Sequence, residues 1–579
     1  MNTRWGETLD ESAILPEYPR PQLQRGSYLN LNGRWQYAIN QTDVVPTVWE
    51  GSILVPFSPE STLSGVNRTL QPDETLWYRR VLTLPDGFNR GRVLLHFGAA
   101  DQDAVVYLNG QEIAHHEGGF NAFTTELTDS LLKGENTLTV RVHDDTDATW
   151  HTRGKQKRQR GGIWYTPQSG IWQTVWVESV PVDYVQGLRL TPHLVESAIE
   201  ITVHAEHDLP CEATLLGKAY PLTTNQAAYI PLENPHLWSP EDPFLYPLTV
   251  QLGEDTVISY FAMRSTSIQA DSHGIKRLFL NGKPYFHNGL LDQGYWPDGL
   301  YTAPSDAALA YDIQTAKDLG FTMLRKHIKV EPMRWYYHCD RLGMLVWQDM
   351  PSGSGEYKFS TITLPLITGR HHDDHDYPRF AREAAEGRDA YRRELTEMVE
   401  QLYNSPCIVL WVPFNEGWGQ FEATETIRLI EKLDSTRPID PASGWHDQHS
   451  GELRTWHIYF KKYRFKPDRI GRAVALSEFG GYNLRIAGHT WTDVDFGYKK
   501  FKDADALLAA YEMLFDTQVL PAIPKGLCAT VYTQLTDVED ELNGLLTYDR
   551  AVCKLPAEAL RALNRVIKDS SANDALKCT

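Results

Sequence analysis

The spacing of hydrophobic and polar residues changes near residue 270 of the chain. Before it, apolar and polar residues alternate in short runs, such as RVLLHFGAAD at 92–101 and NTLTVRVHDD at 136–145. Such alternation predicts half-buried strands, and many short strands separated by turn residues are typical of β-sandwiches. We therefore predict a jelly-roll β-sandwich over residues 1–180 and an immunoglobulin-like β-sandwich over residues 181–270.

After residue 270, apolar runs alternate with helical patterns. A helix is expected over 305–319, with Ser305 at its N-cap and Gly320 just past its end. Further helices are expected at 331–342, 384–404 and 421–434. Eight runs predict strands: YFHNGLLD, FTMLRKH, MLVWQD, CIVLWVPFNE, PIDPASGW, RTWHIY, AVALSEFG and LCATVYTQL. Strands buried on both faces alternate little, so eight such units over 271–579 predict a (β/α)8 TIM barrel.

Composition narrows the classes of protein to consider. The net charge of −19 repels nucleic acid and anionic membrane surfaces, so neither is an expected partner. The six cysteines are scattered, without the spacing of a metal site or a disulfide framework. The N-terminal stretch has no apolar signal segment, and no apolar run approaches the length of a membrane helix. We expect a cytoplasmic protein without a cofactor or metal, and leave a homo-oligomer open.

Two of the predicted barrel strands end on a glutamate. Glu416 follows the apolar run of the fourth strand, and Glu478 follows that of the seventh. The carboxyl ends of barrel strands open onto the active-site face, so both carboxylates would be presented there. One such glutamate could simply pair with a barrel arginine, whereas two at one barrel mouth favour catalysis. Paired carboxylates are the minimum equipment for glycoside hydrolysis.

At these residues the chain resembles glycoside hydrolase family 2, which contains β-galactosidases, β-glucuronidases and β-mannosidases. The stretches ILVPFSPESTLSG and VYLNGQEIAHHEGGFNAFTTELT resemble the sugar-binding domain of that family. DIQTAKDLGFTMLRKHIKVEPMRWYYHCDRLGMLVWQD and NSPCIVLWVPFNEGWG are close to its two signatures. The resemblance covers nearly the whole chain and implies hydrolysis with retention of configuration, through a covalent glycosyl-enzyme.

The resemblance also assigns roles to single residues. Glu416 resembles the general acid/base, Asn415 the residue that binds the sugar 2-hydroxyl, and Glu478 the nucleophile. Arg325 resembles the arginine near the nucleophile, with a structural ion pair as the alternative, and His327 would lie at the pocket rim. Packing is an equal alternative for the remaining substrate-binding candidates, which follow other strands: Asp292, Trp296, Trp445, His457 and Tyr459.

Departures from the family pattern affect which sugar we expect the protein to recognise. Val531-Tyr532 stands where the family usually has a Val-Trp pair. The stretch DELNGLLTYDR lacks the Asn-x-Lys with which β-glucuronidases grip a uronate, and carries Asp540 and Glu541 instead. We therefore predict exo-acting hydrolysis of oligosaccharides or glycosides with terminal β-linked neutral sugars, first of all β-galactosides. A β-mannosidase, a furanosidase, a non-catalytic carbohydrate-binding protein and a scaffold whose sandwiches bind a protein are the alternatives.

Two charged segments remain open to interpretation. HHDDHD at 371–376 resembles a metal site in composition, but a solvated loop beside the pocket explains it better. RGKQKRQRGG at 153–162 is a basic run in an acidic protein. We expect it to pack against the barrel or a subunit rather than to bind nucleic acid.

Overall fold

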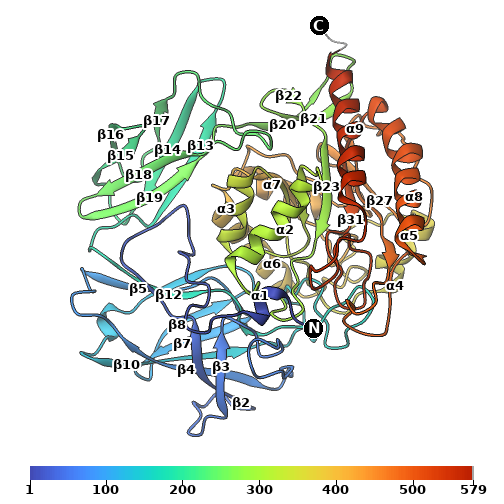
Figure 1. The fold of residues 1–579 in the computed structure, drawn as a ribbon. Helices are drawn as coiled ribbons and strands as arrows, with labels where there is room; N and C mark the ends of the chain where they lie inside the picture. The colour runs from blue at the N-terminus through green and yellow to red at the C-terminus, as the bar shows by residue number, and fades with distance from the viewer. Residues whose placement is uncertain (577–579) are drawn as a thin grey trace.

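The computed structural model describes residues 1–576 and shows three domains. Figure 1 shows the two sandwiches one above the other on the left and the barrel on the right. The predicted fold class is confirmed: two β-sandwiches precede a C-terminal (β/α)8 barrel.

The first sandwich packs a four-stranded sheet against a six-stranded sheet. Their orders are β1-β12-β5-β9 and β3-β2-β4-β10-β7-β8. The large side chains Trp35 and Tyr78 are buried in the core between them. The strands are β1 (Tyr28–Asn30), β2 (Gly33–Asn40), β3 (Gly51–Val55), β4 (Thr75–Thr83), β5 (Arg92–Phe97), β7 (Asp103–Leu108), β8 (Gln111–Glu117), β9 (Phe123–Glu126), β10 (Glu135–His143) and β12 (Val175–Val180).

The second sandwich is smaller, with sheets β13-β14-β17 and β16-β15-β18-β19 around a separate core. A three-stranded sheet, β20-β21-β22, then leads into the barrel. The strands are β13 (Gly187–His193), β14 (Ala198–His204), β15 (Pro210–Leu215), β16 (Lys218–Thr223), β17 (Ala228–Pro231), β18 (Tyr246–Leu252), β19 (Asp255–Phe261), β20 (Thr266–Ala270), β21 (Lys276–Leu280) and β22 (Lys283–Pro284).

Seven parallel strands form the barrel sheet in the order β26-β25-β24-β23-β31-β28-β27. They are β23 (His287–Asp292), β24 (Met323–Lys326), β25 (Leu345–Asp349), β26 (Ile408–Val412), β27 (Leu453–Ile458), β28 (Ala473–Gly480) and β31 (Leu527–Thr533). The fifth predicted strand is shorter than expected and forms only the parallel bridges Trp411↔Ile439 and Asn415↔Ser443. It reaches β27 through the Thr455 hydroxyl, which donates to Asp440 at 3.0 Å.

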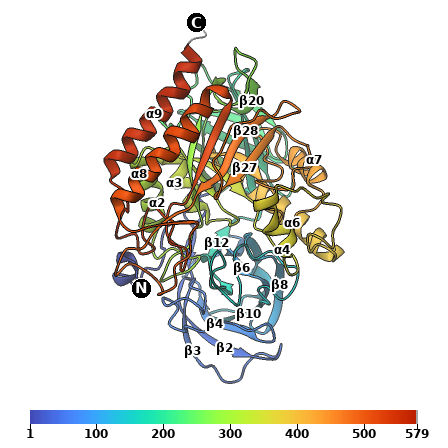
Figure 2. The same cartoon turned by 90° about the vertical axis from the view of Figure 1, so that its right-hand side faces the viewer.

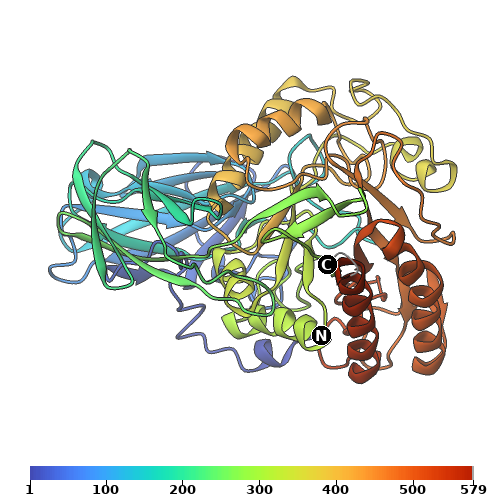
Figure 3. The same ribbon diagram turned by 90° about the horizontal axis from the view of Figure 1, so that it is seen from above.

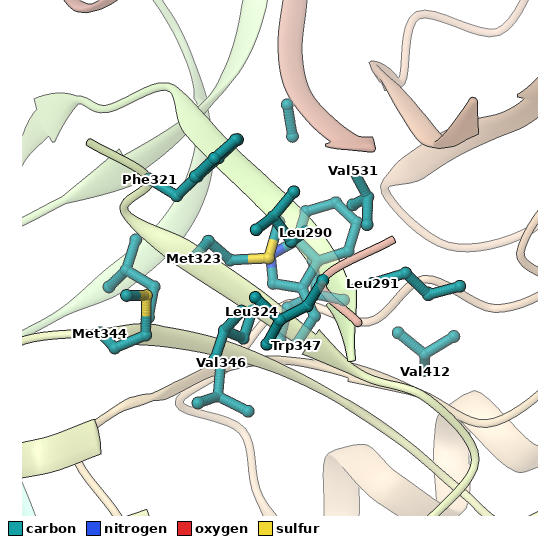
Figure 4. Packing of buried hydrophobic residues seen from close by; sticks show 14 of the residues in the cluster. Leu290, Leu291, Phe321, Met323, Leu324, Met344, Val346, Trp347, Val412 and Val531 are labelled. Carbon is teal, nitrogen blue, oxygen red and sulfur yellow. The ribbon is translucent and has the colours of Figure 1, made fainter. Parts of the chain in front are cut away.

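Apolar side chains from these strands form one large buried cluster. Figure 4 shows Leu290, Met323, Trp347 and Val531 gathered from neighbouring strands, and all four are fully buried. The unbroken apolar runs in the sequence arise because these strands are covered on both sides. Polar residues can be accommodated at the strand ends, and the candidate site lies there.

The predicted helices lie on the outside of the barrel, with ends shifted by one or two residues, as Figure 3 shows from above. They are α2 (Asp306–Asp318), α3 (Met333–Leu342), α6 (Ala385–Leu402) and α7 (Ala423–Leu433). The Ser305 side chain caps α2 by accepting from the Ala308 N–H at 3.2 Å. Two further helices, α8 (Ala504–Leu514) and α9 (Ala557–Leu576), lie next to each other in Figure 2.

One helical stretch in the described residues, 504–525, is long and apolar enough to cross a membrane. It begins with α8 and continues through a π turn and a 3-10 turn. Tyr511, Phe515 and Val519 are fully buried, and Tyr511 and Phe515 meet the aromatic rings of barrel strands at 4.8 Å and 5.5 Å between centroids. Its apolar character is therefore explained by packing against the barrel.

Candidate active site

The loop after β26 and the strand β28 bring Glu416 and Glu478 together at the carboxyl end of the barrel. Both side chains are buried, and one oxygen of each lies within 4.8 Å of the other. In glycosidases, about 5–5.5 Å between the two carboxyl groups accompanies retention, and wider spacing accompanies inversion. The separation here fits a retaining enzyme.

The backbone around Glu416 is held in an uncommon conformation. Glu416 and Gly417 have φ angles of 50° and 73°, in the left-handed region that favours glycine. A side chain at position 417 would come within 2.4 Å of His446. The Glu416 N–H donates to the Ser443 carbonyl at 2.9 Å, which fixes the turn to the fifth strand. Glycine after the glutamate thus allows the turn that aims the carboxylate inward.

Three side chains contact Glu478. Arg325 donates from Nη1 to Oε1 at 3.1 Å, and the Tyr459 hydroxyl donates to Oε2 at 2.5 Å. His457 Nδ1 lies 3.5 Å from Oε2. Burial raises the pKa of Glu478, and the neighbouring Glu416 raises it further, while His457, Arg325 and Tyr459 lower it. The contacts therefore oppose burial and favour the ionised carboxylate that a nucleophile requires.

Tyr459→Phe is expected to lower kcat about 10- to 100-fold, the usual worth of a hydrogen bond to a charged group. The acidic limb of the pH–rate profile should also move to higher pH, because the hydroxyl lowers the pKa of Glu478. Tyr463→Phe is a matched control, since the buried Tyr463 hydroxyl has no hydrogen-bond partner among the described residues. Equal rates and pH profiles for wild type and Tyr459→Phe would contradict this role.

Arg325 links Glu478 to two other polar side chains of the site, Asp349 and Asn415. Its guanidinium holds Asp349 through two hydrogen bonds of 2.9 Å and donates to the Asn415 Oδ1 at 2.8 Å. The Asn415 side chain is thereby oriented, and its buried Nδ2 has no partner among the described residues. A buried amide donor without a partner is costly unless a ligand accepts from it. It is therefore suited to a sugar hydroxyl.

Glu416 has the properties of an acid that works near neutral pH. Burial raises its pKa to about 7, while Lys155 and Arg325 act to lower it. It shares a hydrogen bond of 2.7 Å with His457 Nδ1. Burial lowers the pKa of His457 to about 4, so this imidazole is neutral at pH 7. A carboxyl group with such a pKa can give a proton and take one back.

The pH dependence of kcat/KM should be bell-shaped. Glu416 must be protonated to act as an acid, so activity should fall as the pH rises through about 7. Glu478 must be ionised to attack, so activity should also fall as the pH drops through its own pKa. Initial rates at low substrate concentration between pH 4 and pH 9 test this. A constant rate from pH 6 to pH 9 would contradict the role of Glu416.

The ligand atoms of Glu416, His457 and Glu478 all lie within 4.8 Å of one another, close enough to share a metal ion. The guanidinium of Arg325, however, lies 3.1 Å from Glu478, and its charge opposes a second cation there. A catalytic role for the two carboxylates therefore explains the clustering of these three side chains better than metal binding.

Two predicted sugar-binding residues, Asp292 and Trp296, have partners within the protein. Both Asp292 oxygens accept hydrogen bonds, one from Lys326 at 2.7 Å and one from the Gly294 N–H at 3.0 Å. Trp296 is buried, with the Arg550 guanidinium 4.0 Å from its ring centroid and Trp5 packed edge-on at 6.0 Å. An ion pair thus holds Asp292 and packing covers Trp296, which favours the structural alternative for each. Their roles in substrate binding stay predictions.

The other candidates lie close to the two glutamates. His327 is buried rather than at a rim, with Nδ1 2.9 Å from Asp349, and its ring meets Trp418 edge-on at 6.2 Å. The Trp445 ring lies 6.2 Å from that of His457. Both stay predictions as substrate-binding residues.

Sequence reasoning missed several residues at the site. Asp349 ends β25 and orients Arg325. Tyr498 stacks on Tyr459 at 3.8 Å. Lys155 comes from the first sandwich, and its charge favours ionised Glu416. The end of the run MLVWQD could have indicated Asp349, whereas nothing local indicates the other two.

The basic segment 153–162 packs against the barrel. This was one of the two positions expected for it, the other being the surface of a second subunit. The Arg153 and Gly154 N–H groups donate to the Ser352 carbonyl at 2.8 and 2.9 Å. Arg160 pairs with Asp540 at 3.3 Å. Just beyond it, the Tyr165 hydroxyl donates to Glu541. Asp540 and Glu541, which stand in the sequence where β-glucuronidases carry the Asn-x-Lys motif, thus hold a loop of the first sandwich.

The segment 371–376 has a structural role. Asp374 accepts from the Ala423 N–H at 2.9 Å and so caps the start of α7. His371 accepts from the Asp447 N–H at 3.1 Å, which fixes the segment to the loop after the fifth strand. The ligand atoms of Asp373, Asp374 and His375 also lie within 4.8 Å of one another, but Asp373 and His375 are exposed. The solvated-loop interpretation remains the better explanation.

Comparisons with known proteins agree with this geometry. Family models described as "Glycosyl hydrolase 2 galactose-binding domain-like", "Glycosyl hydrolases family 2" and "Glycosyl hydrolases family 2, TIM barrel domain" match residues 59–173, 184–264 and 275–472. The chain belongs to glycosyl hydrolase family 2. The resemblance inferred from the sequence motifs is therefore confirmed.

Relatives in this family carry two different names. A putative β-glucuronidase of Formosa agariphila is 26% identical over 528 residues, covering 80% of this chain and 57% of that protein. A β-galactosidase of Thermoanaerobacter pseudethanolicus is 22% identical over 391 residues, covering 62% of this chain and 48% of that protein. This chain thus spans about half the length of these curated relatives.

Solved structures share the fold. A β-glucuronidase from an uncultured Clostridium sp. superposes with a TM-score of 0.73 at 18% identity, covering 95% of this chain and 99% of that one. A putative β-galactosidase from Bacteroides fragilis gives 0.67 at 17% identity, covering 93% and 85%. At such identities the likeness establishes the architecture alone.

Proposed function

We propose that this protein is a retaining, exo-acting β-glycosidase that releases a terminal β-linked sugar from a glycoside. The observation that carries the proposal is the buried pair Glu416 and Glu478, with oxygens within 4.8 Å of each other at the mouth of the barrel. Burial favours the protonated form of Glu416, and the contacts of Glu478 with Arg325 and Tyr459 favour its ionised form.

Hydrolysis proceeds in two displacements. Glu478 attacks the anomeric carbon while Glu416 gives its proton to the leaving oxygen, so the aglycone departs as an alcohol. The sugar is then an ester of Glu478. Glu416, now ionised, takes a proton from water, and the resulting hydroxide displaces Glu478 from the opposite face. Two inversions give net retention.

The surrounding residues serve these steps. Arg325 and Tyr459 stabilise the negative charge of Glu478 before attack and after its release. The unpaired Asn415 Nδ2 offers a donor for the 2-hydroxyl, a contact that strengthens in the transition state of such reactions. No cofactor takes part in this scheme.

Two sugars are candidates for the glycone. A β-galactoside is supported by the absence of the Asn-x-Lys motif and by the relatives named β-galactosidase. A β-glucuronide has equal support from the relatives named β-glucuronidase.

A panel of 4-nitrophenyl glycosides tests the reaction and the sugar together. It should contain the β-galactoside, β-glucuronide, β-mannoside, β-glucoside, α-arabinofuranoside and β-galactofuranoside. Cleavage of one or two sugars by the wild type, abolished in Glu416→Gln and Glu478→Gln, supports the proposal. If no glycoside is cleaved, or if a variant keeps the full rate, the two-carboxylate mechanism fails. A non-catalytic carbohydrate-binding protein would then be the better explanation.

We also propose a cytoplasmic location. The cysteines at 211, 339, 407, 528 and 553 are all free thiols, which suits a reducing compartment. Fractionation of the source cells, followed by activity measurement, tests this location.

A further inference from the structure

Lys155 lies at the candidate site although it belongs to the first sandwich. Its side chain is only 5% exposed. The Nζ atom lies 5.7 Å from the ring centroid of Trp418 and 5.5 Å from that of Tyr165. Trp418 follows Glu416 by two positions in the same loop, and its N–H donates to the Asn415 carbonyl at 2.9 Å. The ammonium group therefore sits beside the loop that carries the general acid.

The charge of Lys155 has no counter-ion. Among residues 1–576, no carboxylate oxygen lies within 4.0 Å of its Nζ, and Nζ donates no hydrogen bond. The other buried lysines differ: Lys326 pairs with Asp292 at 2.7 Å, Lys329 with Glu331 at 2.9 Å, and Lys554 with Asp537 at 2.6 Å. The Lys155 side chain is largely buried, but its Nζ is not among the fully enclosed nitrogens, so an anion supplied from outside can reach it and would find a cation without a protein partner.

The position of the charge indicates which part of a substrate it would meet. Among the groups that favour ionised Glu416, Lys155 acts most strongly, ahead of Arg325. Its charge also acts on His327 and His457. Together with the 5.7 Å between Nζ and the Trp418 ring, these interactions place Lys155 on the side of the site that carries the general acid.

We propose that Lys155 binds a carboxylate of the substrate beside the cleaved bond, carried either by the sugar or by the leaving group. This role rests on the proposed glycosidase function and narrows its substrate class to acidic glycosides. Aromatic rings of Trp418 and Tyr165 exclude water around the ammonium and so strengthen an ion pair formed there.

The test compares acidic and neutral substrates in matched pairs. The 4-methylumbelliferyl β-glucoside and β-glucuronide differ only at C6, which is a hydroxymethyl group in one and a carboxylate in the other. The umbelliferyl and 3-carboxyumbelliferyl β-galactosides differ by a carboxylate on the leaving group. In Lys155→Met, the ratio of kcat/KM for acidic over neutral substrate should fall about 10- to 100-fold in one pair. The pair that responds shows where the carboxylate is carried.

Two further variants sharpen the comparison. Lys155→Arg keeps the charge and should retain most of the preference. Lys157→Met removes a cation from the same segment, one whose Nζ lies over the Trp164 ring at 4.5 Å, and should leave the ratio unchanged. Calorimetric titration of the same glycosides gives a readout that does not need turnover.

The outcomes separate the two proposals. Equal ratios for wild type and Lys155→Met in both pairs, in turnover and in binding, would overturn the role of Lys155. A change in the pH profile alone, with unchanged ratios, would assign Lys155 to the ionisation of Glu416 and would equally overturn it. Hydrolysis of a neutral glycoside that depends on Glu478 would still uphold the glycosidase.

Discussion

Replacing Glu478 by glutamine is expected to lower kcat by on the order of 10⁴- to 10⁶-fold, as loss of a nucleophile does in other enzymes with covalent catalysis. An amide of similar size keeps much of the packing around Arg325 and Tyr459 but cannot attack the anomeric carbon. The glycosyl-enzyme then does not form, and no faster route replaces it. Rates with the fastest-cleaved nitrophenyl glycoside, at the optimal pH of the wild type, measure the loss.

The matched control for Glu478→Gln is Glu394→Gln. Glu394 lies in α6, is buried, and has a pKa that burial raises to about 7, but it accepts from Thr152 away from the two glutamates. This variant should keep its activity. A Glu478→Gln protein that is folded by circular dichroism and still turns over at more than a tenth of the wild-type rate would exclude Glu478 as nucleophile.

Replacing Glu416 by glutamine should lower kcat/KM about 10²- to 10⁴-fold, the usual contribution of general acid–base catalysis. The loss should depend on the leaving group. A 2,4-dinitrophenyl group departs without a proton, so glycosyl-enzyme formation should stay fast with that substrate. Its hydrolysis still needs a base, so the intermediate should accumulate and give a burst of dinitrophenol.

The pH profile of Glu416→Gln provides a second signature. The fall in activity near pH 7 should disappear, because the group whose pKa burial raises to about 7 is gone. Stopped-flow absorbance with the dinitrophenyl substrate, between pH 5 and pH 9, measures both effects. An equal loss for good and poor leaving groups, with the basic limb preserved, would show that Glu416 is not the acid/base.

Strand-end positions made the centre of the site predictable. Glu416, Glu478 and Arg325 each follow an apolar run, and barrel topology brings the carboxyl ends of such runs to one face. The eight strands and the outer helices were predictable because the sequence shows the hydrophobic periodicity of each element. Only the fifth strand fell short, forming two bridges where PIDPASGW was expected to form a ladder.

Side-chain direction was not predictable, because distant partners decide it. Asp292 ends a strand as Glu478 does, but Lys326 captures one of its oxygens. Trp296 is covered by Arg550, which belongs to a loop near the C-terminus. Lys155 reaches the site only because the first sandwich docks its segment 153–162 on the barrel, and no local pattern encodes that docking.

Azide rescue tests the central claim most directly, because it assigns the two carboxylates by the stereochemistry of the product. With the activated glycoside that the wild type cleaves fastest, Glu478→Gly in sodium azide should give the glycosyl azide of inverted, α configuration. Glu416→Gly should give the β-glycosyl azide, since Glu478 still forms the intermediate and azide then displaces it. No rescue of either variant, or the opposite configurations, would contradict the double-displacement mechanism.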